Sequence, residues 1–357
     1  MEKVKLGFIG CGFMGQVAHM QNYAVAYQSG WKNFEECEIV AVTDVKQKQR
    51  ERIAAIYGIP NVYSDYHEML AKTEIDAIVA AQPFTNHVNI VPDVLNAGKH
   101  ILTEKPLCVF AENGKKLVEL AAKTGKIHMV GYHKRSDPAT EYAIKTIGEW
   151  KQSNELGKMK YVRVTMPPGH WTGGSREAFR TPNDVESAAS FPREPVPEGI
   201  SPEFAKRYEG FVNYYIHQVN LLRYLVGEDY KVTFADKAQV LMVTESTSGI
   251  TGIIEMAPYN TSHDWQEQAL VCFEKGWIKI ELPAPLASQQ PGRVTIFDNS
   301  KDIGMTISPR LPNVHAMLNQ ARNFVKAVRG ERPAPCVSSE AIKDLEVAMD
   351  YIRMIQP

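Results

Sequence analysis

Glu104, Lys105 and Pro106 directly follow a short apolar run, Ile101–Thr103, and include the first candidate for a reactive group. In an open α/β sheet, ligands bind at the carboxyl ends of the strands. A lysine fixed there and followed by a proline could be held in one position against a reacting oxygen. The alternative is an exposed charge pair at a strand end, which these residues taken alone favour.

A second candidate lies in the segment 213–222 (Asn-Tyr-Tyr-Ile-His-Gln-Val-Asn-Leu-Leu). Helical spacings of four and three residues place Asn213, His217 and Asn220 on one face. A histidine between two amides on one helical face indicates a polar cluster that faces a cavity. The alternative is a core histidine whose neighbours satisfy its hydrogen bonds. The apolar residues of the same helix, expected to be buried, are Ile216, Val219 and Leu222.

A dinucleotide site is predicted near the start of the chain. The pattern Gly-Cys-Gly-Phe-Met-Gly at 10–15 stands between an apolar strand, Val4–Ile9, and a helix expected over about Gln16–Ser29. Glycines in this context permit a tight turn, the approach of a pyrophosphate and close contact between helix and strand. The alternative, a glycine turn that binds no ligand, is less consistent with this context.

The second predicted strand, Glu38–Thr43, ends at Asp44. An acid at this position accepts hydrogen bonds from the ribose hydroxyls and repels a 2′-phosphate, so NAD is favoured over NADP. The basic residues Lys46, Lys48 and Arg50 weaken that preference, unless they form the solvated face of the next helix.

The following residues continue to alternate between strands and helices. The expected elements are a strand Ile75–Ala80, a helix His87–Asn96, the strand before Glu104, a helix Glu112–Lys123 and a strand Lys126–Gly131. This alternation predicts an α/β fold with a parallel, doubly wound sheet. We therefore expect an NAD-binding Rossmann domain over residues 1–135.

From Pro138 onward the pattern changes. A helix (about Ala139–Gln152) and a strand (Met159–Thr165) precede a long section, Met166–Gly210, that is rich in proline and glycine and is expected to be irregular. Such a loop is usually functional or disordered. His170 and Trp171 favour a binding wall or lid, and an oligomer contact is an equal alternative.

The last part of the chain predicts a second domain, 136–357, for substrate binding and oligomerisation. A helix, Phe211–Val226, precedes several strand-like runs without helices between them, which indicates a large, mostly antiparallel open sheet in an α+β domain. The expected runs are Val232–Val243, Gly249–Ala257, Gln268–Phe273, Trp277–Leu282 and Arg293–Phe297, and the final helices are about Val314–Arg329 and Ser338–Met354.

The composition restricts the class of protein. The chain has 357 residues, 44% hydrophobic and 23% charged, which is ordinary for a globular protein. A net charge of −1 favours neither nucleic acid nor an anionic membrane as a partner. The five cysteines show no CxxC spacing and the N-terminus lacks a signal-peptide core, so we expect no metal site and a cytoplasmic location.

These motifs resemble the glucose–fructose oxidoreductase / inositol dehydrogenase / MocA (Gfo/Idh/MocA) family of NAD(P)-dependent oxidoreductases. The resemblance spans nearly the whole chain, and its most specific part runs from Ala-Gly-Lys-His at 97–100 to Glu-Lys-Pro at 104–106. It also rests on residues 10–15, on Pro83 with Asn86 and His87, and on the helix around His217. The family fold is a Rossmann domain followed by an α/β domain with a large open sheet.

The resemblance implies that Lys105 is catalytic and that His217, within the family pattern Asp-x-x-x-His-x-x-Asp, is its catalytic partner. Amides, Asn213 and Asn220, replace both acids of that pattern here. The expected cofactor contacts are Gly10, Gly12, Phe13, Met14, Gly15, Asp44, Gln82, Pro83, Asn86, His87, Glu104, Lys105 and His133. The expected substrate contacts are Lys105, His133, His170, Trp171, Asn213, His217 and Asn220.

The implied reaction moves a hydride between nicotinamide and a secondary hydroxyl or ketone of a sugar, a glycoside or a cyclitol. The 3-position of a glucoside is one candidate. A neutral His217 would accept the hydroxyl proton. A cationic Lys105 would stabilise the developing alkoxide, and loss of such a donor typically costs about 100–1,000-fold in rate.

Two other functions remain open. One is an NAD-dependent enzyme that oxidises a glycoside transiently and cleaves it, and the other is a non-catalytic NAD-binding regulator. For each of the three we expect a small-molecule ligand and neither nucleic acid nor a membrane as partner. An open sheet with one uncovered face also predicts a homodimer or homotetramer.

Overall fold

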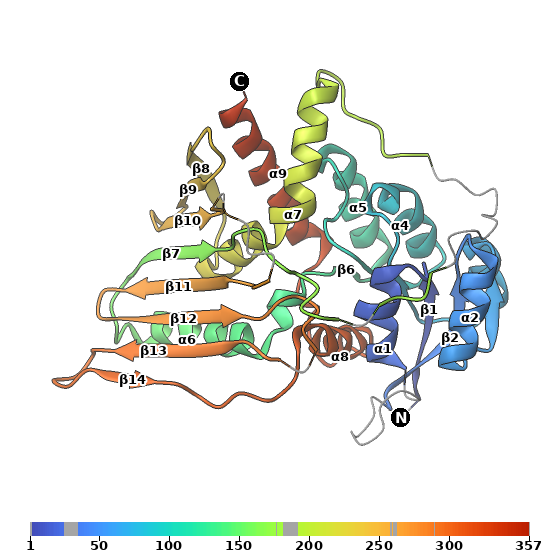
Figure 1. The fold of residues 1–357 in the computed structure, drawn as a ribbon, viewed down its shortest axis with the longest axis horizontal. Coiled ribbons are helices and arrows are strands. Elements are labelled where there is room, and N and C mark those ends of the chain that lie inside the picture. Colours follow the sequence, from blue (N-terminus) through green and yellow to red (C-terminus); the bar gives the residue numbers. More distant parts are fainter. Residues whose placement is uncertain are drawn as a thin grey trace. The chain divides into compact units, whose positions relative to one another are not determined.

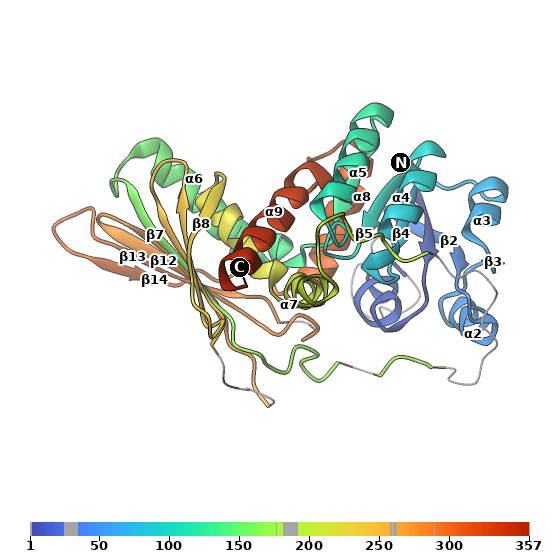
Figure 2. The same ribbon diagram turned by 90° about the horizontal axis from the view of Figure 1, so that it is seen from above.

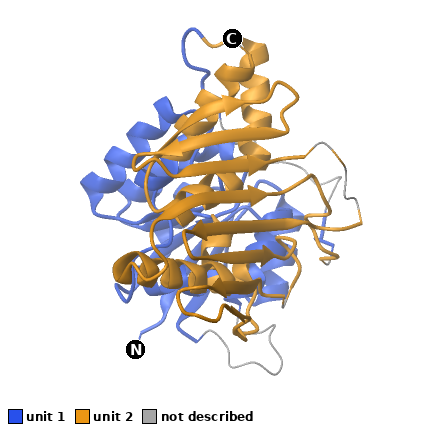
Figure 3. Cartoon of the chain, turned by 90° about the vertical axis from the view of Figure 1, so that its left-hand side faces the viewer, with its two compact units in different colours: residues 1–131, 176–199, 320–342 blue, residues 132–175, 200–319, 343–357 orange. Residues whose placement is uncertain are grey.

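The computed structural model describes residues 2–24, 35–175, 177–180, 192–257, 259, 263–288 and 290–356. The chain forms two compact units, which Figure 3 shows in different colours. Unit 1 contains residues 1–131, 176–199 and 320–342, and unit 2 contains 132–175, 200–319 and 343–357. The chain first passes from unit 1 to unit 2 after Gly131, four residues before the domain boundary expected at 135. The sequence did not predict that two later segments, 176–199 and 320–342, return to unit 1.

Unit 1 contains a six-stranded parallel sheet in the order β3-β2-β1-β4-β5-β6. This is the strand order of a Rossmann fold, so the predicted doubly wound sheet is confirmed. The strands are β1 (Val4–Ile9), β2 (Cys37–Thr43), β3 (Asn61–Tyr63), β4 (Ala77–Ala80), β5 (His100–Thr103) and β6 (His128–Val130).

The helices that follow strands β2 to β5 are α2 (Gln47–Tyr57), α3 (Tyr66–Lys72), η3 (Phe84–Asn86), α4 (His87–Asn96) and α5 (Ala111–Thr124). Helices α4 and α5 of unit 1 follow their strands as expected, whereas α3 was not predicted and the first crossover differs. There a π-helical segment, η1 (Gly15–Met20), precedes the short α1 (Gln21–Tyr23). The rest of the predicted helix, 25–29, lies outside the described residues.

Residues from the last third of the chain complete the core of unit 1. Ala321, Phe324 and Val325 of α8 (Ala316–Val328) belong to the same apolar cluster as Leu6 and Phe8 of β1. A β-bridge between Met129 and Val337 attaches the same return segment to β6. Burial of these side chains explains why 320–342 belongs to unit 1.

The other return segment is attached to unit 1 by a buried carboxylate. Glu194 accepts hydrogen bonds from the backbone N–H groups of Val109 (2.7 Å) and Phe110 (2.9 Å) and from the Asn113 side chain (2.8 Å). Phe110 precedes the first residue of α5, so Glu194 provides acceptors at a helix N-terminus from a distant part of the chain.

Unit 2 contains an eight-stranded sheet in the order β14-β13-β12-β11-β7-β10-β9-β8 (Figure 1). All its pairs are antiparallel except β10 with β7, so the mostly antiparallel sheet is confirmed. The strands are β7 (Met159–Thr165), β8 (Tyr230–Ala235), β9 (Leu241–Ser246), β10 (Thr251–Glu255), β11 (Glu267–Phe273), β12 (Gly276–Leu282), β13 (Arg293–Asp298) and β14 (Met305–Ile307).

Helices α6 (Pro138–Ser153) and α7 (Pro202–Val226) pack against this sheet (Figure 2). A short 3-10 turn, η4 (His133–Ser136), precedes α6, and α9 (Ser338–Ile355) ends the described helices. Of these described helices, none is both long and apolar enough to span a membrane.

Three details of unit 2 differ from the sequence prediction. Helix α7 begins at Pro202, nine residues before the predicted start, because Ser201 caps it through a bond from Phe204 N–H and proline suits its first turn. The run Val232–Val243 is not one strand, since a turn around Gln239 (φ 61°) separates β8 from β9. The three-residue β14 was missed.

Glu194→Ala tests the attachment of the return segment. The variant leaves two buried N–H groups near the start of α5 without their acceptor, so we expect the free energy of unfolding to fall by about 1–3 kcal/mol in a denaturant titration. The exposed Glu198→Ala is the matched control and should change it little. Equal stability of both variants would contradict this role of Glu194.

Candidate active site

The glycine-rich turn after β1 is packed without space for side chains at two positions. Gly10 has φ +98°, which favours glycine. A Cβ on Gly15 would lie 2.4 Å from the Gly10 carbonyl oxygen, whereas one on Gly12 would meet no protein atom within 4 Å. The turn therefore packs tightly where the helix meets the strand and is open at its middle, as a pyrophosphate site requires.

Asp44 ties this turn to the end of β2. Its carboxylate accepts hydrogen bonds from the backbone N–H groups of Cys11 (2.6 Å) and Lys46 (2.9 Å), one on each oxygen. A carboxylate oxygen can accept more than one hydrogen bond, so both oxygens retain capacity for ribose hydroxyls. Asp44 thus both holds the turn and presents an acid to the ligand.

A pocket of about 470 Å³ opens over the turn and the ends of β2 and β4. Six of the predicted cofactor contacts line it: Gly10, Gly12, Asp44, Gln82, Pro83 and Asn86. None of the described residues lining the pocket is a lysine or arginine, and two are aspartates, Asp44 and Asp65. That charge distribution suits NAD and disfavours a 2′-phosphate. Lys46, Lys48 and Arg50 are not among the lining residues.

Gln82 provides the clearest sign that a ligand belongs in this pocket. Both polar atoms of its side chain are buried, and neither has a hydrogen-bond partner among the described residues. Buried amides are almost always hydrogen-bonded, so a bound nucleotide would supply the missing partners. The residues present therefore fit a dinucleotide.

The far wall of the pocket was not predicted. The Tyr66 and His67 rings stack with centroids 4.0 Å apart, and His67 contacts Asp65 through Nδ1 (2.8 Å) and Asp93 through Nε2 (3.1 Å). Burial disfavours protonation of this imidazole, but the hydrogen bonds and charges of both aspartates raise the pKa of His67. The preceding strand β3 has only three residues, which is too short for a periodicity signal.

Lys105 directly follows β5 and is half-buried. The preceding Glu104 carboxylate lies 2.6 Å from Nε2 of His19, on the π-helical segment, and both side chains are buried. Burial of Glu104 opposes its ionisation, yet His19 and then Lys105 lower the pKa of this carboxyl below its usual value. Sequence reasoning missed His19, since no motif marks it.

His87 lies in the core of unit 1. Its Nδ1 lies 3.0 Å from the Leu107 carbonyl oxygen, and burial lowers the pKa of His87 to about 4. The ring is therefore neutral at physiological pH and contacts the segment that follows Lys105. His87, Glu104, Lys105, Phe13, Met14 and Gly15 do not line the 470 Å³ pocket.

Unit 2 brings two predicted site residues together. The His133 and His217 rings make an edge-to-face contact with centroids 4.8 Å apart, and the Tyr132 ring lies 5.8 Å from His217. His133 is buried on η4, whereas His217 is half-buried on α7. Burial of Ile216, Val219 and Leu222 confirms the predicted apolar face of α7.

The two amides that flank His217 occupy different environments. Asn213 is exposed, but Asn220 is only 1% exposed. Asn220 accepts a hydrogen bond from Arg135 Nε (2.8 Å) and donates one to Asp344 (2.7 Å). Both ends of this amide are thus engaged within unit 2.

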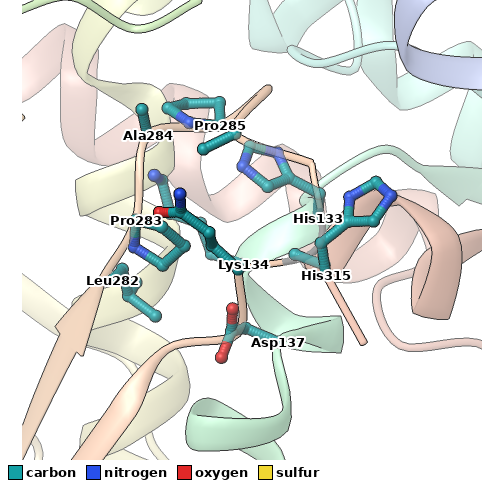
Figure 4. A pocket seen from close by; sticks show the side chains of 11 residues that line it. His133, Lys134, Asp137, Leu282, Pro283, Ala284, Pro285 and His315 are labelled. Carbon is teal, nitrogen blue, oxygen red and sulfur yellow. The ribbon is translucent and has the colours of Figure 1, made fainter. Parts of the chain in front are cut away.

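A small second pocket lies beside His133. The other residues that line it are Lys134, Asp137, Leu282–Pro285, Ala287, Gln290, His315 and Ala316 (Figure 4). Burial raises the pKa of Asp137 to about 6. The hydrogen bonds that its carboxylate accepts from the Ala139 and Gly292 N–H groups act in the opposite direction and lower this pKa. The volume of this pocket is about 10 Å³, enough for about one water molecule and too small for a sugar ring.

The loop after β7 is tied down within unit 2. His170 is exposed, and its N–H donates to the Asp264 carbonyl. Trp171 is 39% exposed, and its carbonyl accepts from Leu286 N–H (3.3 Å). The preceding Gly169 donates to the Tyr214 hydroxyl of α7 (3.3 Å). Neither His170 nor Trp171 lines the pocket of Figure 4.

Comparison with known proteins agrees with this geometry. Residues 4–132 match the model of the oxidoreductase family with NAD-binding Rossmann fold (GFO_IDH_MocA). The chain is 25% identical to scyllo-inositol 2-dehydrogenase (NAD(+)) of Bacillus subtilis, over 98% of this chain and 93% of the relative. These matches confirm the resemblance to the Gfo/Idh/MocA oxidoreductases that the motifs predicted, and NAD as the cofactor.

Solved structures show the same fold. An NAD binding oxidoreductase from Klebsiella pneumoniae superposes with a TM-score of 0.73 at 16% identity, over 99% of this chain and 97% of the other. The apo scyllo-inositol dehydrogenase from Lactobacillus casei gives 0.69 at 17% identity, over 99% and 96%. At this identity the likeness establishes the fold alone.

Gln82→Met tests the cofactor pocket. Methionine keeps the length of the side chain but removes its two unpartnered polar atoms. We expect the cofactor-free protein to be at least as stable as the wild type and the Kd for NADH to rise by about 3–10-fold, as for one lost hydrogen bond. Fluorescence titration and thermal unfolding measure the two effects.

The exposed Gln47→Met is the control and should leave the Kd for NADH unchanged. An unchanged Kd for the Gln82 variant would contradict the assignment of this amide to the cofactor.

Proposed function

We propose that the protein is an NAD-dependent dehydrogenase that oxidises a secondary hydroxyl of a cyclitol or sugar ring, or catalyses the reverse reduction. The main support is the acid-lined pocket, where the buried Gln82 amide has no partner in the part of the chain that the structure describes. A half-buried lysine at the end of β5 belongs to the same unit. The names of the inositol dehydrogenases among the relatives favour a cyclitol.

The cofactor supplies one function when bound: nicotinamide C4 accepts the hydride. The protein must then hold the substrate hydroxyl and remove its proton. We propose that the Lys105 ammonium donates a hydrogen bond to the reacting oxygen and stabilises its negative charge. Glu104, in contact with His19, places a carboxylate next to this lysine.

We propose His217 as the proton acceptor. An imidazole has an intrinsic pKa suited to general base catalysis near neutral pH. The edge contact with His133 limits the orientations of its ring. Among the amides, exposed Asn213 is the better candidate for a substrate contact, since both ends of Asn220 are engaged within unit 2.

The finer choice of substrate is also a proposal. Trp171 is exposed over 39% of its surface and could stack on an apolar face of a sugar or aglycone. That would extend the substrate range to glycosides, including oxidation at the 3-position of a glucoside.

Five cysteines without a disulfide are consistent with the expected reducing cytoplasm.

Lys105→Met and His217→Asn test the proposed roles. With inositols and glucosides as a substrate panel, we expect NADH formation at 340 nm to fall by about 100–1,000-fold for Lys105→Met. For His217→Asn we expect a loss of about 100–10,000-fold. The Kd for NADH should change little in the His217 variant.

Lys123→Met, an exposed lysine on α5, is the control and should retain full turnover. Full turnover by Lys105→Met would overturn the role of this lysine. If the wild type reduces NAD with no member of the panel, the proposed dehydrogenase function falls.

We also propose that the protein is a homodimer or homotetramer that assembles through the sheet of unit 2. The register places Tyr161, Cys272, Trp277 and Phe297 in one row across β7, β11, β12 and β13. All four are half-buried, and the Trp277 and Phe297 rings stack at 6.0 Å. A row of this kind suits a self-complementary interface.

Trp277→Arg tests this surface. A charge in the middle of an apolar interface is costly, so light scattering should show a smaller species than for the wild type. Ile303→Arg, at an apolar residue that is 79% exposed and outside the row, should leave the mass unchanged. A wild-type protein with the mass of a monomer would refute the assembly.

A further inference from the structure

Glu267, the first residue of β11, is a carboxylate with no exposed surface. Lys134 Nζ donates to its Oε2, and Gln218 Nε2 donates to its Oε1 at 2.7 Å. The Lys134 side chain is only 4% exposed and Gln218 only 1%. A buried charge is tolerated only when it is paired and hydrogen-bonded, so the positions of these three side chains depend on one another.

The two partners of Glu267 directly follow the two histidines in the chain. Lys134 follows His133 on η4, and Gln218 follows His217 on α7. The rings of these histidines are the pair in edge contact at 4.8 Å. One carboxylate therefore joins the two backbone segments that carry the two rings.

Other contacts restrict the same network. Met166 Sδ lies 2.8 Å from Gln218 Nε2, and the Trp265 ring lies 5.7 Å from Lys134 Nζ. Lys134 is thus enclosed by a carboxylate and an aromatic ring, and Gln218 by a carboxylate and a thioether. In such surroundings hydrogen bonds are strong and an alternative arrangement is costly.

We propose that Glu267 is a positioning residue, whose carboxylate fixes His133 and His217 relative to each other and so sets the orientation of the proton-accepting imidazole. The catalytic part of this inference rests on the proposed function, whereas the geometric part does not. A buried ion pair contributes little net stability compared with apolar packing, but it specifies one arrangement of its neighbours. Here the ion pair would fix the position of His133 relative to His217.

The geometric part is tested by histidine ring NMR signals of the full chain, assigned with His133→Asn and His217→Asn variants. Glu267→Gln keeps the shape and removes the charge, and we expect it to shift the signals of both rings. Lys134→Met should shift mainly His133, and Gln218→Met mainly His217. Glu274→Gln removes an exposed ion pair with Lys160 just beyond the other end of β11 and should shift neither.

The variant Lys134→Met/Glu267→Gln removes both charges and keeps the test decisive if Glu267→Gln does not fold. We expect it to fold and to shift both rings. Histidine signals that stay in place in every folded variant of Glu267 would overturn the proposal.

The catalytic part is tested by steady-state turnover of the folded variants with the best cyclitol or sugar. A misplaced base should lower kcat by about 10–100-fold while KM changes much less. Shifted rings with unchanged kcat would overturn this part alone. If the variants shift the histidine signals but the wild type shows no dehydrogenase activity, the positioning role stands and the proposed function falls.

Discussion

The close approach of Gly15 to the Gly10 carbonyl is the constraint on which the ligand-binding edge of unit 1 depends. No side chain fits between them, so the chain turns sharply and η1 begins directly against the sheet. In this turn the backbone N–H of Cys11 donates a hydrogen bond to the Asp44 carboxylate, and a Cβ on Gly12 would meet no protein atom within 4 Å. The pocket lies over that turn, between Asp44 after β2 and Gln82 after β4, whose buried amide has no hydrogen-bond partner among the described residues.

Buried charge plays the corresponding part in unit 2. One network joins Glu267 to Lys134 and Gln218, and a second joins Asp344 to Arg223 and Asn220. Both networks hold α7, which carries His217. Because each charged group would be costly to leave alone in the interior, the helix has little freedom to shift or rotate. An imidazole on a helix held in this way needs no carboxylate on its own helix to fix its position.

The regular parts of both units could be predicted from the sequence. The glycine pattern after an apolar strand predicted the cofactor turn, and alternation of strands and helices predicted the parallel sheet. Local signals also gave α4 (His87–Asn96) and β7 (Met159–Thr165) to the residue. The start of α7 was missed although Ser201 and Pro202 mark it, because the proline-rich stretch before it suggested an irregular loop throughout.

The parts that were missed depend on tertiary contacts. Nothing around His19, Glu194 or Glu267 in the sequence shows that each is buried against a distant partner. The return of residues 320–342 to unit 1 follows from the burial of side chains such as Phe324, which a strand-by-strand prediction does not reveal. Helical spacing and the family resemblance led us to expect Asn220 at the substrate, but neither can show that Arg135 and Asp344 occupy its amide.

The most direct test of the account is deuterium transfer from a cyclitol that carries deuterium on the carbon of the reacting hydroxyl. After incubation of the enzyme with NAD and the labelled cyclitol, mass spectrometry of the nicotinamide shows whether the label arrives at C4. Direct hydride transfer from the ring carbon should give one deuterium per NADH formed, at a slower rate than with the unlabelled cyclitol. NADH without deuterium, or an unlabelled cofactor after complete conversion of the cyclitol, would contradict it.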